Sequence, residues 1–303
     1  MNVIETSGLS GRPRDAGGRL DVTLAVPPGV RLAVIGAEGS GKSALVRLLL
    51  DLDPVRSGTV RVLGKKPSQL SGPTFARIGY VPQHHLVPLQ LNVRQHLARW
   101  RGFYPTWDHE FALRLSVRLA LPMDVRANHL ERPLRLKAAL LSSLAYRPEL
   151  LIMDGSFDQM EDGDRREVSA ALDEALVPGR SVLLATAREA ASTEGICDHI
   201  AWLQEGRIQV LDRVDALKNQ YRRITVTFAH PPGRTVDLPP GWILLDARGR
   251  RLHAVDTRFG DGSTLRDWLA PFPGATVEER PMALAEIGEA LARRAAGRGG
   301  DEP

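Results

Sequence analysis

The chain has 303 residues, of which 43% are hydrophobic, and this length can hold one large and one small domain. Its formal net charge of +4 comes from arginines scattered along the chain without interleaved aromatic residues, a pattern that argues against a nucleic-acid partner. No apolar run approaches the about 20 residues that cross a membrane, and the single cysteine, Cys197, excludes an internal disulfide framework, so we expect a protein of the reducing cytoplasm.

Short β-branched runs alternate with segments of helical periodicity from about Asp21 to Val210. The expected strands are Asp21–Val26, Leu32–Ile35, Val60–Leu63, Ile78–Val81, Leu150–Met153, Ser181–Ala185 and His199–Leu203. The expected helices are Lys42–Leu50, Asn92–Trp100, Trp107–Leu119, Leu134–Ala145 and Asp164–Ala175. This alternation predicts an α/β domain with a largely parallel central sheet.

The pattern changes after a short helix expected at Val214–Tyr221. Two Pro-Pro-Gly breaks then interrupt strand-like runs, and two helical segments follow. These segments are the strands Ile224–Phe228, Trp242–Leu245 and Leu252–Val255 and the helices Thr264–Leu269 and Met282–Arg294. We therefore predict two domains, residues 1–220 and a small α+β domain of residues 221–303 with a frayed tail from Ala296.

Residues 36–43 read Gly-Ala-Glu-Gly-Ser-Gly-Lys-Ser, the complete pattern of a P-loop, between an expected strand and an expected helix. In such a loop the backbone N–H groups surround phosphates, Lys42 reaches the terminal phosphates of a nucleotide, and the Ser43 hydroxyl can bind Mg2+. A glycine-rich turn would match this pattern by chance in roughly one chain in a hundred. The residues expected to bind the cofactor are Gly36, Gly39, Ser40, Gly41, Lys42 and Ser43.

Two later positions extend the pattern. Gln83 follows the expected strand Ile78–Val81, and Asp154 ends the apolar run that begins at Leu150. With the P-loop in this order, the chain from about Leu9 to Leu211 resembles the ATP-binding subunit of an ABC transporter.

This resemblance implies a RecA-like parallel sheet core, a helical subdomain at about residues 84–147, and ATP and Mg2+ as cofactors. It further implies that Ser43, Gln83 and Asp154 arrange the metal. Gln83 would also be a cofactor-binding residue and would link the metal site to a membrane partner. The aromatic segment Gly102–Asp108 resembles a phrase of the drug and cell-envelope exporter type, although an aromatic mini-core under a helix turn would explain it equally well.

Two positions depart from the family where hydrolysis takes place. Family members follow the metal-binding aspartate with a glutamate that polarises water, and this chain has Gly155; the family's switch histidine aligns with Ala187. A general base is worth roughly 10²- to 10⁴-fold in rate. No catalytic residue is therefore intact. The acids Asp158, Glu161 and Glu189 lie nearby in the sequence, but none of them directly follows the strand end. Whether the chain is an enzyme stays open.

The other two departures concern the contacts around the nucleotide. The family's Leu-Ser-Gly-Gly-Gln signature falls at Leu130–Leu134, where Glu131 replaces the serine and Pro133 removes an N–H, so this helix start should cap a phosphate badly. The aromatic residue that stacks on adenine is missing from Gly11–Arg14. We expect weaker and less base-selective binding.

Together these observations predict an ATP-binding subunit with weak or absent hydrolysis, peripheral on the inner face of the cell membrane. It would dock on a separate permease through the Gln83 region and the helical segment Phe103–Leu119, as a homodimer or as a heterodimer with a second ATP-binding chain. The alternative is a pseudo-ATPase that senses nucleotide or serves as a scaffold in a membrane assembly. A soluble ABC-type protein acting on nucleic acid is disfavoured because no heptad pattern is sustained.

Overall fold

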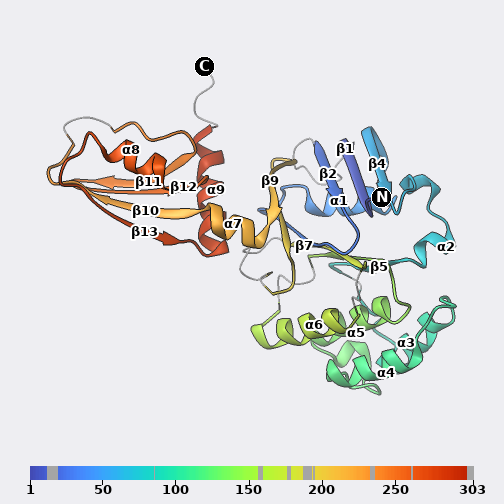
Figure 1. Ribbon diagram of the computed structural model, residues 1–303. Helices are drawn as coiled ribbons and strands as arrows, with labels where there is room; N and C mark the ends of the chain where they lie inside the picture. The colour runs from blue at the N-terminus through green and yellow to red at the C-terminus, as the bar shows by residue number, and fades with distance from the viewer. Residues whose placement is uncertain are drawn as a thin grey trace. The chain divides into compact units, whose positions relative to one another are not determined.

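The computed structural model describes residues 1–11, 20–84, 86–155, 160–175, 179–186, 193, 195–232, 236–260 and 262–298, the last five of them by their backbone only (Figure 1). The described residues form two compact units, the first ending at Leu211 and the second beginning at Asp212. The boundary predicted from the sequence, between residues 220 and 221, lies on the other side of helix α7 (Val214–Gln220). That division into separately folding domains stays a prediction.

A six-stranded sheet forms the centre of the first unit, with the strand order β5-β6-β7-β3-β8-β9. Its strands are β3 (Arg31–Ile35), β5 (Ile78–Val81), β6 (Leu150–Asp154), β7 (Ser181–Thr186), β8 (His199–Gln204) and β9 (Arg207–Arg213). The five strands from β5 to β8 in this order run parallel. Every residue of β6 is buried, as expected of a parallel strand covered on both faces, and the predicted parallel α/β core is confirmed.

A second, antiparallel sheet has the order β2-β1-β4. Its strands are β1 (Ile4–Gly11), β2 (Val22–Val26) and β4 (Val55–Val62). The sequence pattern did not predict β1, and it placed the other two strands in the alternating array. The reason is that the β1–β4 pairing is irregular around Gly8: a Cβ atom built on Gly58 would lie 2.2 Å from the Gly8 carbonyl oxygen. A close approach of two backbones at glycines leaves no alternation of apolar and polar residues in the sequence, so the pattern cannot predict it.

Helices cover the larger sheet. They are α1 (Lys42–Leu49), α2 (Gly72–Phe75), α3 (Val93–Arg101), α4 (His109–Arg118), α5 (Arg132–Leu144) and α6 (Asp162–Ala175), with the 3-10 turns Pro67–Gln69 and Ala127–His129. Helix α1 contacts both β4 and the central strands, while α3 to α6 gather on the other side of the larger sheet in Figure 1. Lys137 of α5 joins α6 through Asp164 at 2.5 Å and Glu167 at 2.8 Å.

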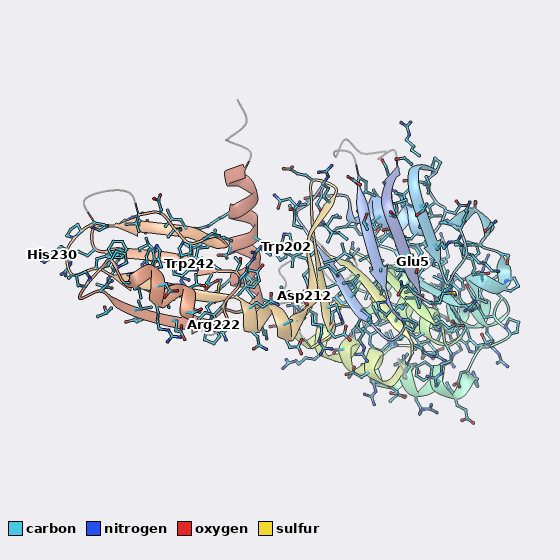
Figure 2. All side chains as sticks on the ribbon, turned by 45° about the horizontal axis from the view of Figure 1, so that its top comes forward. Glu5, Trp202, Asp212, Arg222, His230 and Trp242 are labelled. Atoms are coloured by element: carbon cyan, nitrogen blue, oxygen red, sulfur yellow. The ribbon has the colours of Figure 1, made fainter. Side chains whose placement is uncertain are left out.

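The second unit is a four-stranded antiparallel sheet with the order β11-β12-β10-β13 and three helices. Its elements are α7, β10 (Arg222–Thr227), β11 (Trp242–Arg248), β12 (Arg251–Asp256), α8 (Ser263–Leu269), β13 (Thr276–Pro281) and α9 (Leu284–Arg298). Figure 2 shows Trp242 among the side chains on this sheet, where it contacts Trp268 at a ring distance of 5.2 Å. The α+β character predicted for this region is confirmed.

Two features of this unit differ from the sequence-based expectation. Strand β13 was not predicted because most of its residues are exposed and half of them are charged, as is usual for the edge of a sheet. Helix α9 continues to Arg298, past the predicted start of the frayed tail at Ala296, and residues 299–303 lie outside the described part. Within the described ranges, no helix combines the length and apolar character that crossing a bilayer requires.

His96 is the most deeply buried polar group between α3 and α5. Its side chain is 2% exposed, its Nε2 lies 3.2 Å from Ser142 Oγ, and burial lowers the pKa of the imidazole to about 4. Its ring also contacts Trp100 edge-on. The folded protein therefore holds this histidine neutral.

Because the unfolded chain protonates His96 near pH 6.5 and the folded chain only near pH 4, the unfolded state binds more protons between these values. The stability that depends on neutral His96 is therefore fully present above pH 6.5. As the pH falls toward 4, the free energy of unfolding decreases by on the order of 2–3 kcal/mol. We expect His96→Leu to lose less free energy of unfolding than the wild type between pH 7 and pH 4.5 in urea titrations. His109→Gln, which changes an exposed histidine, is the control; equal pH slopes for wild type and His96→Leu would contradict the assignment.

Candidate functional site

The site lies where three parallel strands end. Strand β3 ends at Ile35 and leads into the loop 36–41, β5 ends at Val81 just before Gln83, and β6 ends at Asp154. Since the carboxyl ends of parallel strands come out at one edge of a sheet, the topology brings these segments together, and ligands commonly bind at such an edge.

Each glycine of the loop is required for a different physical reason. A Cβ atom on Gly36 would lie 2.1 Å from the Leu203 carbonyl oxygen, so only glycine fits against β8. Gly39 has a φ of +79° in open space, and Gly41 combines a φ of +107° with a Cβ position 2.8 Å from Leu20. The loop is therefore held in one shape by its neighbours and by backbone angles that other residues rarely adopt.

Lys42 is the first residue of α1 and is 8% exposed. Its ammonium group donates to the carbonyl oxygens of Gly36 at 2.7 Å and Ala37 at 2.6 Å and to Ser40 Oγ at 3.1 Å. The charge is thus held inside the curl of the loop, next to the first N–H groups of α1, which have no partner within the helix. Positive charge, free N–H groups and the helix dipole all favour a bound anion at this point.

Ser43 and Asp154 link the loop to β6. Ser43 Oγ donates to Asp154 Oδ1 at 2.8 Å, and Asp154 is 7% exposed. The described ranges contain no group of three or more histidine, cysteine or acidic side chains that could hold a metal ion by themselves. A hydroxyl beside one carboxylate fits Mg2+, which binds proteins through one or two such oxygens and takes its other ligands from phosphate and water.

Tyr80 of β5 lies close enough to the carboxylate of Asp154 for its pKa to be affected. Burial, together with the charge of Asp154, raises the pKa of Tyr80 to about 12. The phenol stays protonated at neutral pH, so Asp154 supplies the anionic oxygen here and Tyr80 does not.

Gly155 and Gln83 occupy the space beside Asp154. Gly155 has a φ of +58°, and its N–H donates to the Ala185 carbonyl oxygen at 2.8 Å. A Cβ atom on Gly155 would lie 2.9 Å from Cδ, 3.0 Å from Cγ and 3.1 Å from Nε2 of Gln83. The Gln83 side chain is therefore packed into the place where a side chain of residue 155 would begin.

Helix α5 begins without a side-chain cap. Glu131 is the N-cap residue and its carboxylate makes no capping hydrogen bond, while Pro133 stands in the first turn. Arg132, the first helical residue, instead donates from Nη2 to the Gln83 carbonyl oxygen at 2.9 Å. The start of α5 is thus tied to the segment after β5 within the same chain.

The structure brings Gly36 to Ser43, Gln83, Asp154 and Gly155 to one edge of the sheet. Ala187, Asp158, Glu189 and residues 12–14, where the aromatic residue is missing, lie outside the described residues, and Glu161 is exposed. The contact of Arg132 with Gln83 was not foreseen, since no spacing rule relates a loop to a helix start 49 positions later.

Residues 20–158 match the family model described as ABC transporter. The chain is 25% identical to the ABC transporter ATP-binding protein YtrB of Bacillus subtilis (strain 168) over 69% of this chain and 71% of that protein. It is 26% identical to the Nod factor export ATP-binding protein I of Rhizobium leguminosarum bv. viciae over 92% of both chains. It spans 12% of ATP-binding cassette sub-family A member 7 of Rattus norvegicus, at 29% identity.

The solved structures that share the fold include the following two. The ATP-binding subunit of an ABC transporter is similar with a TM-score of 0.62 and 23% identity, over 72% of this chain and 92% of that one. The ATP-binding cassette MJ0796, in a dimeric post-hydrolysis state bound to ADP and Pi, is similar with a TM-score of 0.60 and 18% identity, over 70% of this chain and 98% of that one.

The packing of Gln83 against Gly155 can be measured with a matched pair of glycines. Gly249 has a φ of +57°, almost that of Gly155, but a Cβ atom there meets nothing within 4 Å. We expect Gly249→Ala to cost about 1 kcal/mol of unfolding free energy from backbone strain. Gly155→Ala should cost about 1–2 kcal/mol, because the Gln83 side chain must also move aside. In urea titrations, Gln83→Ala should recover the additional cost in the Gly155→Ala background, and equal costs at the two glycines would refute the crowding.

Proposed function

We propose that the chain is an ATP-binding subunit of the ABC transporter family, which its residues 20–158 match. It binds ATP with Mg2+, docks on a separate membrane permease and hydrolyses ATP weakly or not at all. The observation that carries this proposal is the combination of an intact phosphate loop with a crowded glycine at residue 155.

The binding half of the proposal rests on Lys42, Ser43 and Asp154. Lys42 and the loop N–H groups would hold the terminal phosphates, with Gly36, Gly39, Ser40 and Gly41 shaping the loop. The Ser43–Asp154 pair would hold Mg2+, with the Gln83 side chain nearby. When bound, Mg2+ neutralises phosphate charge; the protein groups orient the phosphates against it.

In the proposed function, hydrolysis of ATP is slow because the residue after Asp154 has no side chain. Gly155 cannot accept a proton from water, and the amide of Gln83 that fills the space can orient a water molecule but cannot deprotonate it. Restoring a carboxylate at residue 155 would require Gln83 to move and a residue with a side chain to adopt a φ of +58°.

The start of α5 supports poor contact with a nucleotide on a second chain. In the dimer that we propose, homodimer or heterodimer, this helix start would face the partner chain's phosphates. A carboxylate at Glu131 and a proline in the first turn weaken a phosphate site there, because one adds negative charge and the other removes an N–H. Both sites of a homodimer would then turn over slowly.

Docking on a permease is supported by exposed apolar side chains of the helical region. Phe103 is 69% exposed, Val117 81% and Leu113 49%, all within or beside α3 and α4. Leu113 and Val117 lie one turn apart on α4, and adjoining exposed apolar residues are typical of a contact surface. The relative that matches over 92% of this chain is named an export ATP-binding protein, which favours an exporter, and the inner face of the membrane as its location.

A second candidate is a pseudo-ATPase that senses nucleotide or holds a membrane assembly together. It is favoured by the same packing of Gln83 against Gly155, since this arrangement fills the catalytic space with a neutral amide. The two candidates share nucleotide binding and differ in turnover.

Nucleotide binding and phosphate release test both candidates. We expect the purified chain to bind ATP in the presence of Mg2+, and Lys42→Ala to weaken binding by about tenfold or more, since a buried charge contact to phosphate is lost. Lys66→Ala, which removes an exposed lysine, should leave the affinity unchanged. Titration calorimetry measures the affinities of the wild type and of the two variants. If the wild type does not bind ATP, both candidate functions are wrong.

Phosphate release separates them. We expect release at least about 10²-fold slower than in a family member that has the glutamate. Release above the level of Lys42→Ala, with the chain alone or with its permease, supports a transporter subunit. Release equal to that of Lys42→Ala under both conditions favours the scaffold.

A further inference from the structure

Arg132 links two parts of the first unit that the sequence separates widely. It is the first residue of α5, its side chain is partly buried, and its Nη2 donates to the backbone carbonyl oxygen of Gln83 at 2.9 Å. Its Nε is buried and finds no hydrogen-bond partner within the described residues. The guanidinium is therefore directed at one acceptor, the carbonyl of Gln83, and this contact fixes the backbone of the residue whose side chain reaches the site.

From Gln83 the contacts continue to the metal-binding pair. The Gln83 side chain is packed against Gly155, the residue before Gly155 in the chain is Asp154, and Asp154 accepts a hydrogen bond from Ser43. Arg132 itself touches none of the phosphate loop residues in the described contacts. Any effect of Arg132 on a ligand at Ser43 and Asp154 that uses these contacts must therefore pass through Gln83.

We propose that Arg132 is a positioning residue: it holds the Gln83 backbone so that the Gln83 amide stays beside Asp154 and contributes to binding ATP in its Mg2+ complex. This inference rests on the proposed function. Without the Arg132 contact, Gln83 would have to be ordered when the ligand binds, and the entropy lost in ordering it would reduce the affinity. With the contact, the side chain is already in place.

A different role for the same residue makes a different prediction. If Arg132 acted through its positive charge on the phosphates, its removal would weaken nucleotide binding whether or not Mg2+ is present. If it acts through Gln83 beside the metal-binding pair, its removal weakens mainly the Mg2+-dependent part of the affinity. The two roles also differ in whether the effect needs the Gln83 side chain.

The experiment measures the affinity of the full chain for a fluorescent ATP analogue, once with Mg2+ and once with EDTA. The variants are Arg132→Met, which keeps an unbranched side chain but removes the donor, Gln83→Ala, and the two together. Arg135→Met is the matched control, since this arginine lies one turn further along α5 and no contact with Gln83 is recorded for it in the described residues. Thermal unfolding of each variant checks that α5 remains folded.

We expect Arg132→Met to weaken binding about fivefold with Mg2+, the size of one ordinary net hydrogen-bond contribution, because Arg132 acts on the ligand only through Gln83. With EDTA, where only Lys42 and the loop act, we expect less than about twofold. In the Gln83→Ala background, Arg132→Met should add nothing, because coupled residues are not additive. Arg135→Met should match the wild type in both conditions.

Equal weakening with and without Mg2+, or independent effects of Arg132→Met and Gln83→Ala, would overturn the proposal, and so would an Arg132→Met affinity equal to that of the wild type. If the wild type itself fails to bind the analogue, the proposed function fails instead. The two failures are distinguishable because the second appears already in the unsubstituted chain.

Discussion

The hydrogen bond between Ser43 and Asp154 is the contact around which the site is organised. It joins the first turn of α1 to the end of β6, and it forms because β3 and β6 lie in one parallel sheet with β7 between them. Parallel strands deliver their carboxyl ends to the same edge. The position of the phosphate loop, of the acidic oxygen and of Gln83 all follow from this register.

Lys42 and the loop N–H groups at this edge are placed to hold an anion, and in the function that we propose no base beside Asp154 activates water. Lys42 is enclosed by its own loop, and glycines 36, 39 and 41 keep that loop in shape. Beside them, the absence of a side chain on Gly155 leaves room that Gln83 fills. A site can bind through backbone N–H groups and one ammonium, whereas proton transfer needs a base at one particular point.

The start of α5 shows how one helix end can change its role. A helix N-terminus with small residues and free N–H groups binds phosphate; here Glu131 and Pro133 weaken that ability, and Arg132 turns toward Gln83 in its own chain. The helix end therefore makes an internal contact instead of offering its donors outward. Arg132, which lies between Glu131 and Pro133, is the residue that contacts the segment after β5.

The sequence alone determined the local chemistry of the site. The loop from Gly36 to Ser43, the strand that ends at Asp154 and the parallel α/β core could be predicted because glycine spacing, apolar runs and helical periodicity are local signals. Strand β1, the crowding of Gly155 by Gln83 and the contact of Arg132 with the Gln83 carbonyl could not. Each of them depends on atoms from distant segments meeting within about 3 Å, and only the packing of sheet and helices in three dimensions fixes such distances.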